Sequence, residues 1–193
     1  MAKRGNLIVL EGGCDATLQA MLQRLYRWMR GQGKAVEQTA EPTYGPVGAQ
    51  IRLLQQGRLQ IDPIGFALLG VADRMDHLGR EDGICSWLDA GRHVLCARYL
   101  LFSYASLRHQ FDLDWLQRIN ARCRVPDLTL FLDTVPADPA AQQLRRQSLA
   151  LVELLQHEGQ HIVVVDGKQG GDQVFAACRQ HIVALVGEGA DDR

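Results

Sequence analysis

The chain has 193 residues, of which 47% are hydrophobic, and a formal net charge of −1. This size and balance fit one globular domain with a full core, and the near-neutral charge argues against a nucleic-acid or membrane-surface partner. No apolar run reaches the roughly 18 residues that a transmembrane helix needs, and the N-terminus lacks the features of a signal peptide.

The first predicted strand, 6–10, runs into a glycine-rich turn, and a helical pattern begins near Leu18. Strand, glycine-rich turn and helix are the layout of a phosphate-binding P-loop, whose G-x-x-x-x-G-K-[ST] arc ends in a lysine for the phosphates and a hydroxyl for Mg²⁺. This turn is too short, and it has neither a glycine at the second glycine position of the motif nor a lysine. We interpret it as a degenerate P-loop without a triphosphate cradle. Its residues are Glu11, Gly12, Gly13, Asp15 and Thr17.

The start of this first helix still offers free backbone N–H groups and a partial positive charge, which favour a weakly bound anion near Thr17. Asp15 places a carboxylate at the same point and opposes such binding. Aspartate is also a favoured N-cap residue. We therefore predict that Asp15 caps the helix.

Further along the chain, apolar runs and helical patterns alternate, which predicts a parallel sheet covered by helices. The runs 94–96, 128–132 and 162–165 are apolar at successive residues, as in strands buried on both faces. We expect one α/β domain over 1–193 with a three-layer P-loop NTPase-like fold, a five-stranded parallel sheet and a disordered tail at 187–193. The other strands are predicted at 34–39, 92–96, 127–133 and 161–165, and the other helices at 45–56, 62–79, 81–90, 112–123, 137–157 and 170–186.

Five short stretches, in this order, carry a resemblance to a known family. They are E-G at 11–12, E-P-T-Y-G-P-V-G at 41–48 with I-R at 51–52, D-P at 62–63 with L-L at 68–69 and A-D-R at 72–74, A-R-Y at 97–99, and P-D-L-T-L-F-L-D at 126–133. The chain resembles the thymidylate kinases, a family of nucleoside monophosphate kinases, over roughly 5–182. The resemblance implies transfer of the γ-phosphoryl group of ATP to dTMP with Mg²⁺, a reaction that depends on positioning and charge stabilisation. ATP and Mg²⁺ are implied by the resemblance alone.

The chain departs from the family at the groups that handle charge. Ala40 stands where the family's R-E-P motif has an arginine for the monophosphate, and Ala97 stands where its D-R-Y motif has an aspartate at the magnesium and phosphates. Gly70 replaces the phenylalanine that stacks on thymine. Phe66, one helical turn earlier, either substitutes for that ring or packs in the core.

Other positions keep the family's residue. Arg98 matches the arginine that grips the acceptor phosphate, and it follows a predicted strand at the edge where parallel sheets bind ligands. Arg74 matches the arginine that hydrogen-bonds the base, although a lone helical arginine is commonly a surface residue. The candidates for monophosphate binding are Arg98, Arg74, Glu41, Pro42 and Tyr99, with a turn-forming role as the alternative for Glu41 and Pro42.

In the lid region, where the family supplies arginines over ATP, the chain has Arg145 and Arg146, which equally fit a solvated helix face. His157 and His161 are four residues apart, but a strand is predicted to start near His161, so that they do not form a metal site. Five cysteines without a C-x-x-C pair argue against disulfides or zinc and fit a reducing cytoplasm. We assign no catalytic residue and no metal site.

Four departures at separate motifs, with the core strands retained, favour a thymidylate-kinase-like protein with little or no phosphoryl transfer that retains nucleotide or phosphate binding. The alternative is an active nucleoside monophosphate kinase whose donor site is rebuilt, with an arginine or a partner chain in place of the lysine. We also expect a homodimer, because the segment 62–79 carries more apolar residues than one buried face needs.

Overall fold

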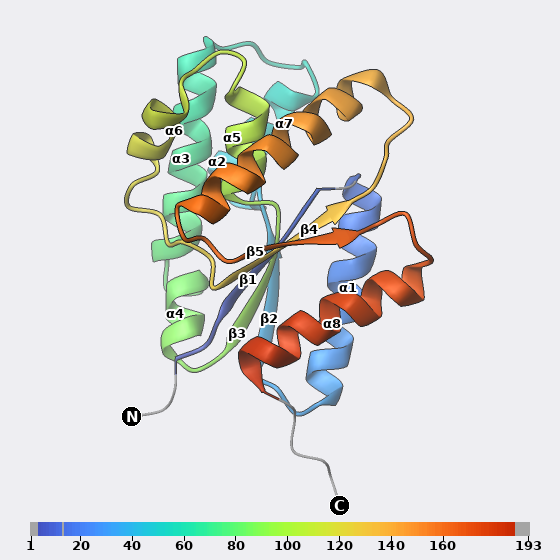
Figure 1. Cartoon of the computed structure of the whole chain (residues 1–193). Coiled ribbons are helices and arrows are strands. Elements are labelled where there is room, and N and C mark those ends of the chain that lie inside the picture. Colours follow the sequence, from blue (N-terminus) through green and yellow to red (C-terminus); the bar gives the residue numbers. More distant parts are fainter. Residues whose placement is uncertain (1–3, 13, 188–193) are drawn as a thin grey trace, which may run out of the picture.

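The computed structural model describes residues 4–12 and 14–187, so that Gly13 and all but the first residue of the predicted tail lie outside the described residues. Over these ranges, five strands form one parallel sheet in the order β2-β3-β1-β4-β5 (Figure 1). The predicted α/β fold with a five-stranded parallel sheet is confirmed. The strands are β1 (Leu7–Gly12), β2 (Val36–Ala40), β3 (His93–Ala97), β4 (Leu128–Asp133) and β5 (Ile162–Asp166).

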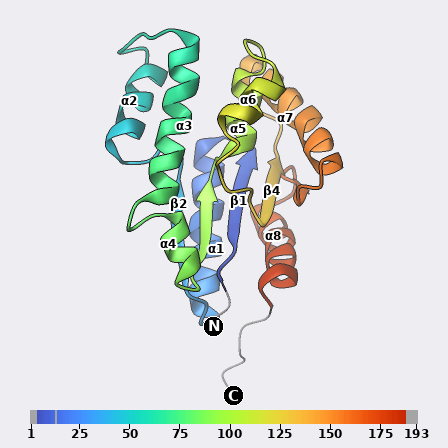
Figure 2. The ribbon, with the colours of Figure 1, turned by 90° about the vertical axis from the view of Figure 1, so that its left-hand side faces the viewer.

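Helices cover both faces of the sheet and give three layers (Figures 1 and 2). One face packs against α1 (Asp15–Gly31) and α8 (Gly171–Val186). The other face packs against a second hydrophobic cluster, to which α3 (Pro63–Gly79), α4 (Ile84–Asp89), α5 (Leu100–Leu107), α6 (Leu113–Ile119) and α7 (Pro139–His157) contribute. The remaining helix, α2 (Pro46–Gln55), packs against α3.

The central strand β1 shows why its sequence is apolar at every position from Leu7 to Leu10. Leu7 and Val9 belong to the cluster on the α3–α7 side, whereas Ile8 and Leu10 belong to the cluster beneath α1 and α8. Successive side chains of a strand point to opposite faces of the sheet. Because helices bury both faces here, apolar side chains fill both sets of alternate positions from Leu7 to Leu10, and the buried Glu11 follows them near the carboxyl end of the strand.

One helix, α5, was not predicted from the sequence. It starts only three residues after β3 ends, and five of its eight residues are buried. Burial on most sides removes the alternation of apolar and polar positions by which a surface helix is recognised. The short apolar stretch at 100–107 therefore gives no helical period.

The helix α1 begins earlier than its apolar pattern predicts. Cys14 is the N-cap residue and makes no side-chain capping hydrogen bond, and Asp15 is the first residue of the helix. The prediction that Asp15 caps α1 is wrong. Asp15 lies one residue past the N-cap position, which Cys14 occupies, and its carboxylate instead contacts Arg98.

The sheet register brings the ends of three strands together. Ala97, the last residue of β3, pairs with Leu10 of β1 on one side and with Ala40 of β2 on the other. The next residues continue this alignment, because Glu41 N donates to Ala97 O at 3.0 Å and Arg98 N donates to Leu10 O at 2.9 Å. Glu41 and Arg98 therefore leave the same carboxyl edge of the sheet, which is where open α/β sheets bind ligands.

Candidate functional site

The turn from β3 to α5 carries Arg98 in an unusual backbone conformation. Its φ of 60° lies in the left-handed region, which non-glycine residues rarely adopt and which is more frequent at functional sites. The turn is held by Glu11, whose Oε1 accepts hydrogen bonds from Tyr99 N at 2.8 Å and Phe102 N at 3.2 Å. Glu11, which the sequence placed in the degenerate P-loop, therefore fixes the start of α5.

Glu11 is buried at the junction of β1 and this turn. Burial raises the pKa of Glu11 from its usual 4.5 to about 7, although the hydrogen bond from the Phe102 N–H and the charge of Arg98 lower it. Its second oxygen, Oε2, has no hydrogen-bond partner among the described residues. The turn from β3 to α5 therefore holds the Glu11 carboxyl group through Oε1 and leaves Oε2 without a hydrogen bond from the described residues.

Arg74 of α3 is a buried arginine, contrary to the surface alternative. Its Nη2 lies 2.7 Å and its Nε 2.9 Å from Glu41 Oε2. Nη1 donates to Asn120 Oδ1 at 2.6 Å, and Nη2 donates to Ser103 Oγ at 2.7 Å. Burial by itself lowers the pKa of Arg74, but the Glu41 carboxylate raises it above the usual range. The guanidinium group therefore stays charged and is neutralised by Glu41.

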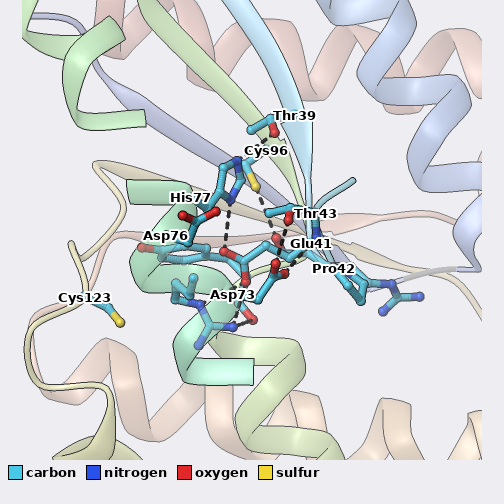
Figure 3. A network of polar contacts seen from close by, with 12 residues as sticks. Thr39, Glu41, Pro42, Thr43, Asp73, Asp76, His77, Cys96 and Cys123 are labelled. Atoms are coloured by element: carbon cyan, nitrogen blue, oxygen red, sulfur yellow. Dashed lines mark hydrogen bonds and ion pairs between the residues drawn. The ribbon is translucent and has the colours of Figure 1, made fainter. Parts of the chain in front are cut away.

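Glu41 is held from its other side as well (Figure 3). Its Oε1 lies 3.3 Å from His77 Nδ1, and His77 Nε2 lies 2.7 Å from Thr39 Oγ1. The neighbouring turn is fastened to α3 by Asp73, which accepts from Thr43 N at 2.8 Å and from Thr43 Oγ1 at 2.5 Å. The turn from β2 to α2 that carries Glu41 and Pro42 is thereby fixed to α3 by a buried polar network.

Beside this network lies a cavity of about 270 Å³, which we call the apolar cavity. Its polar end holds Arg74, Ser103 and Asn120, and most of its lining surface is apolar. Gly70 lines it too, and a side chain at that position would meet open space. Its apolar wall includes Phe66, Leu107, Leu116 and Ile119. Apolar walls with a few convergent polar groups are typical of small-molecule pockets.

A second cavity, of about 440 Å³, lies at the ends of β2 and β3, and we call it the arginine cavity. Ala40 and Ala97 line it, so that neither strand end supplies a charge there. Arg98 and Arg52 supply the cations. Arg52 Nη1 donates to Thr43 O and, at 3.1 Å, to Pro42 O. Within the described ranges it pairs with no carboxylate.

Arg52 was not among the site residues predicted from the sequence. The signal was present, because Arg52 belongs to the I-R pair that follows the E-P-T-Y-G-P-V-G stretch. Arg52 lies on α2 and lines the same cavity as the ends of β2 and β3, two strands that are far apart in the sequence. This position depends on the packing of α2 against α3, which the motif does not reveal.

A third cavity, of about 270 Å³, lies at the turn from β1 to α1 and at α7, and we call it the turn cavity. Glu11, Gly12, Asp15, Arg98 and Arg145 are among its lining residues. Of the predicted lid residues, Arg145 reaches this cavity but is paired with Asp133 at 2.5 and 2.8 Å. Arg146 is exposed and lines none of the three cavities.

Two further residues were assigned to the predicted degenerate P-loop, of which Gly13 lies outside the described residues. Thr17 lines none of the three cavities, and its hydroxyl lies 3.1 Å from the sulfur of Cys14. No lysine is found among the described residues that line the turn cavity, and its Asp15 carboxylate is already paired with Arg98. The described residues of the turn cavity therefore lack the lysine that a P-loop places on the phosphates of Mg²⁺-bound ATP.

Arg98, the candidate for the acceptor phosphate, is paired as well. Its Nη2 and Nε lie 2.6 and 2.7 Å from Asp15 Oδ1, and its guanidinium group lies 4.0 Å from the centre of the Phe102 ring. The two candidate arginines, Arg74 and Arg98, are therefore neutralised by Glu41 and Asp15. The sequence analysis named both arginines as candidates and predicted neither ion pair.

Two wider properties follow from the described part of the chain. Among residues 4–12 and 14–187, no group of three or more His, Cys, Asp or Glu side chains is arranged to hold a metal ion. Over the same residues, no helix has the length and apolar character needed to cross a bilayer.

Comparison with known proteins gives a consistent result. The family model for thymidylate kinase matches residues 17–174. A probable thymidylate kinase from Pyrococcus horikoshii is 37% identical, with 76% of this chain and 71% of the relative covered. The thymidylate kinase of Chlorobaculum tepidum is 33% identical over 75% and 70% of the two chains. That of Clavibacter michiganensis subsp. michiganensis is 30% identical over 96% and 98%. The chain therefore belongs to the thymidylate kinase family.

Proposed function

We propose that the protein binds a nucleoside monophosphate and transfers phosphoryl groups very slowly or not at all. The observation that carries the proposal is the contrast between the cavities. The apolar cavity and the arginine cavity share Arg98 and Glu41, and together offer an apolar wall, convergent polar groups and Arg52 without a carboxylate partner. The turn cavity offers arginines that carboxylates already occupy.

In this proposal the nucleobase occupies the apolar cavity. Arg74 Nη1 gives one N–H to Asn120 and has another to give, and Asn120 Nδ2 gives one to Leu116 O and likewise has a second. The Ser103 hydroxyl accepts from Arg74 and remains able to donate. These donors at the end of an apolar cavity suit the acceptor atoms on a nucleobase edge.

The phosphate occupies the arginine cavity, next to Arg52. A guanidinium group binds phosphate through paired N–H donors, and such charge-assisted hydrogen bonds are stronger than neutral ones. Since relatives of this chain are named thymidylate kinases, dTMP is the first ligand to test.

Slow or absent phosphoryl transfer follows from what the strand ends and the turn supply. Ala97 offers no oxygen ligand to a metal ion, and Arg98 and Arg145 are held by Asp15 and Asp133. Loss of a single preorganised donor at a transition-state charge typically costs about 2.7–4 kcal/mol, a factor of about 10² to 10³ in rate. Such losses are not additive, but two of them already remove most of an ordinary kinase rate.

One observation favours the alternative of an active kinase with a rebuilt donor site. Arg98 and Arg145 both line the turn cavity, where a donor phosphate would lie. For this function Arg145 has to leave Asp133 and replace the missing lysine. A coupled assay of ATP-dependent dTMP phosphorylation decides between the two functions, because turnover in the usual kinase range of about 1–100 s⁻¹ would support the alternative.

The binding proposal is tested by thermal shift and calorimetry with dTMP, other nucleoside monophosphates and ATP, each with and without Mg²⁺. Ligands that bind the folded state raise its apparent stability. We expect a shift with a monophosphate, little shift with ATP, and a weaker effect at high salt. An ATP shift larger than every monophosphate shift would overturn the proposal.

The proposal includes a homodimer formed through α3 and located in the cytoplasm, where a reducing environment suits the unpaired cysteines among the described residues. Ile64, Leu68 and Met75 of α3 are exposed, at the spacing of one helix face, and Ile61 extends this stripe. A contiguous exposed apolar stripe is a common mark of an interface. Light scattering at micromolar concentration should give a dimer for the wild type and a monomer for Leu68→Glu. A monomeric wild type would refute the dimer.

A further inference from the structure

The ion pair between Arg98 and Asp15 lies where the three cavities meet. Arg98 lines the apolar cavity, the arginine cavity and the turn cavity, and Asp15 lines the last two. The pair joins the end of β3 to the first residue of α1, so that it spans the carboxyl edge of the sheet. Any ligand phosphate that approaches Arg98 from the arginine cavity therefore meets the Asp15 carboxylate.

The two partners differ in how firmly they are held. Arg98 is fixed by the left-handed turn, by the Phe102 ring beneath its guanidinium group, and by burial that leaves its side chain 15% exposed. The Asp15 side chain is 83% exposed, and within the described residues Arg98 is its one ion-pair partner. Arg98 Nε and Nη2 both contact the same oxygen, Asp15 Oδ1. The Arg98 guanidinium group is thus held in position to bind an anion, and the Asp15 carboxylate is the anion that it binds in this structure.

We propose that Asp15 determines the charge of the ligand that the cleft accepts, by acting as an internal anion that competes with a ligand phosphate for Arg98. This inference rests on the proposed nucleoside monophosphate site. A ligand phosphate has to displace the Asp15 carboxylate from Arg98. The phosphate is also repelled by that carboxylate, since at Arg98 the two anions would lie well within the Debye length of about 8 Å at physiological ionic strength. An uncharged nucleoside meets neither penalty.

The same competition affects Arg74 less. Its partner Glu41 is buried and bonded on both oxygens, so that the pair behaves as one neutral unit. Of the arginines in the arginine cavity, Arg52 alone is then left to attract a phosphate. The cleft should therefore distinguish a monophosphate from its nucleoside only modestly, and Asp15 should be the residue that limits the difference.

A matched control lies elsewhere on the surface. Arg24 Nη2 and Asp172 Oδ1 are 2.6 Å apart, and the Asp172 side chain is highly exposed like that of Asp15. This pair joins α1 to α8 and lines none of the three cavities. Asp172→Asn removes the same charge from the same kind of exposed pair without touching the cleft.

The test is calorimetry of thymidine, dTMP and inorganic phosphate with the wild-type chain, Asp15→Asn and Asp172→Asn, with circular dichroism to confirm that each variant folds. We expect Asp15→Asn to tighten dTMP binding on the order of threefold to tenfold, as release of an exposed ion pair and of one repulsive charge allows. Thymidine binding should stay within error. Asp172→Asn should change neither affinity.

The possible outcomes separate this inference from the function on which it rests. If the wild type binds dTMP and Asp15→Asn binds it no more tightly, the internal-anion role is wrong and the monophosphate site stands. If dTMP binds to Asp15→Asn alone, Asp15 is the competitor and the wild-type site is not a monophosphate site. If neither protein binds dTMP or thymidine, both proposals fall.

Discussion

The two halves of the cleft hold their arginines in opposite ways. On the side of α2, α3 and α5, the side chains of Arg74 and Glu41 are 3% and 8% exposed and belong to a network that includes His77 and Asn120. On the side of the β1–α1 turn, Arg98 pairs with a largely exposed Asp15. Breaking a buried pair leaves an uncompensated buried charge, whereas an exposed pair is worth little. The first half is therefore part of the folded core, and the second is a surface contact that a ligand or mutation can rearrange.

The ion pairs of the two halves should differ most in how much each contributes to the free energy of unfolding. Glu41→Ala leaves Arg74 buried without its carboxylate, and we expect a loss of about 3–5 kcal/mol of unfolding free energy. Asp15→Ala, which breaks the exposed pair, should cost at most about 1 kcal/mol. Urea denaturation of the two variants measures both losses. Equal losses would show that the Glu41 network is not the more deeply integrated of the two.

The next effect concerns Glu11, which lies between the halves. Its pKa of about 7 in the folded chain exceeds its usual 4.5, so that the folded chain binds more protons between these pH values. The contribution of Glu11 to stability is therefore fully present below about pH 4.5 and is lost as the pH rises through 7. Ionisation of the buried group should cost about 3 kcal/mol, because one pKa unit corresponds to about 1.4 kcal/mol.

The Glu11 effect is isolated by subtraction, since other groups titrate over the same range. In Glu11→Gln the carbonyl oxygen still accepts from the Tyr99 and Phe102 N–H groups, but the group no longer ionises. The unfolding free energy of the wild type minus that of Glu11→Gln should decrease from pH 5 to pH 8. A difference that stays constant over this range would mean that Glu11 keeps an ordinary pKa.

A smaller set of effects compares the two arginines of the arginine cavity. Arg52→Ala should weaken dTMP binding by roughly tenfold to a hundredfold, the worth of a charged hydrogen bond. Arg98→Ala should weaken it less, because Arg98 is already paired with Asp15. Calorimetry gives both values, and Arg52→Lys, which keeps the charge, should recover part of the loss. A larger loss in Arg98→Ala than in Arg52→Ala would reverse the assignment of the phosphate contact.

The sequence predicted the sheet well because burial on both faces leaves a continuous apolar run, as at 7–10. It missed α5 for a related reason, since a helix buried on most sides loses its period. It named Arg74 and Arg98 as candidates from their positions in motifs, and both line the apolar cavity. It did not predict the pairing of Arg98 with Asp15, which depends on how the first turn of α1 meets the end of β3.

We propose that the apolar and arginine cavities bind a nucleoside monophosphate and that the turn cavity does not bind ATP. The most direct measurement is calorimetry of the wild-type chain with dTMP and with Mg²⁺-bound ATP in one buffer at one ionic strength. We predict that dTMP binds clearly more tightly than ATP, because Arg52 in the arginine cavity has no carboxylate partner among the described residues, whereas Arg98 and Arg145 in the turn cavity are paired with Asp15 and Asp133. Tighter binding of ATP than of dTMP would contradict the account.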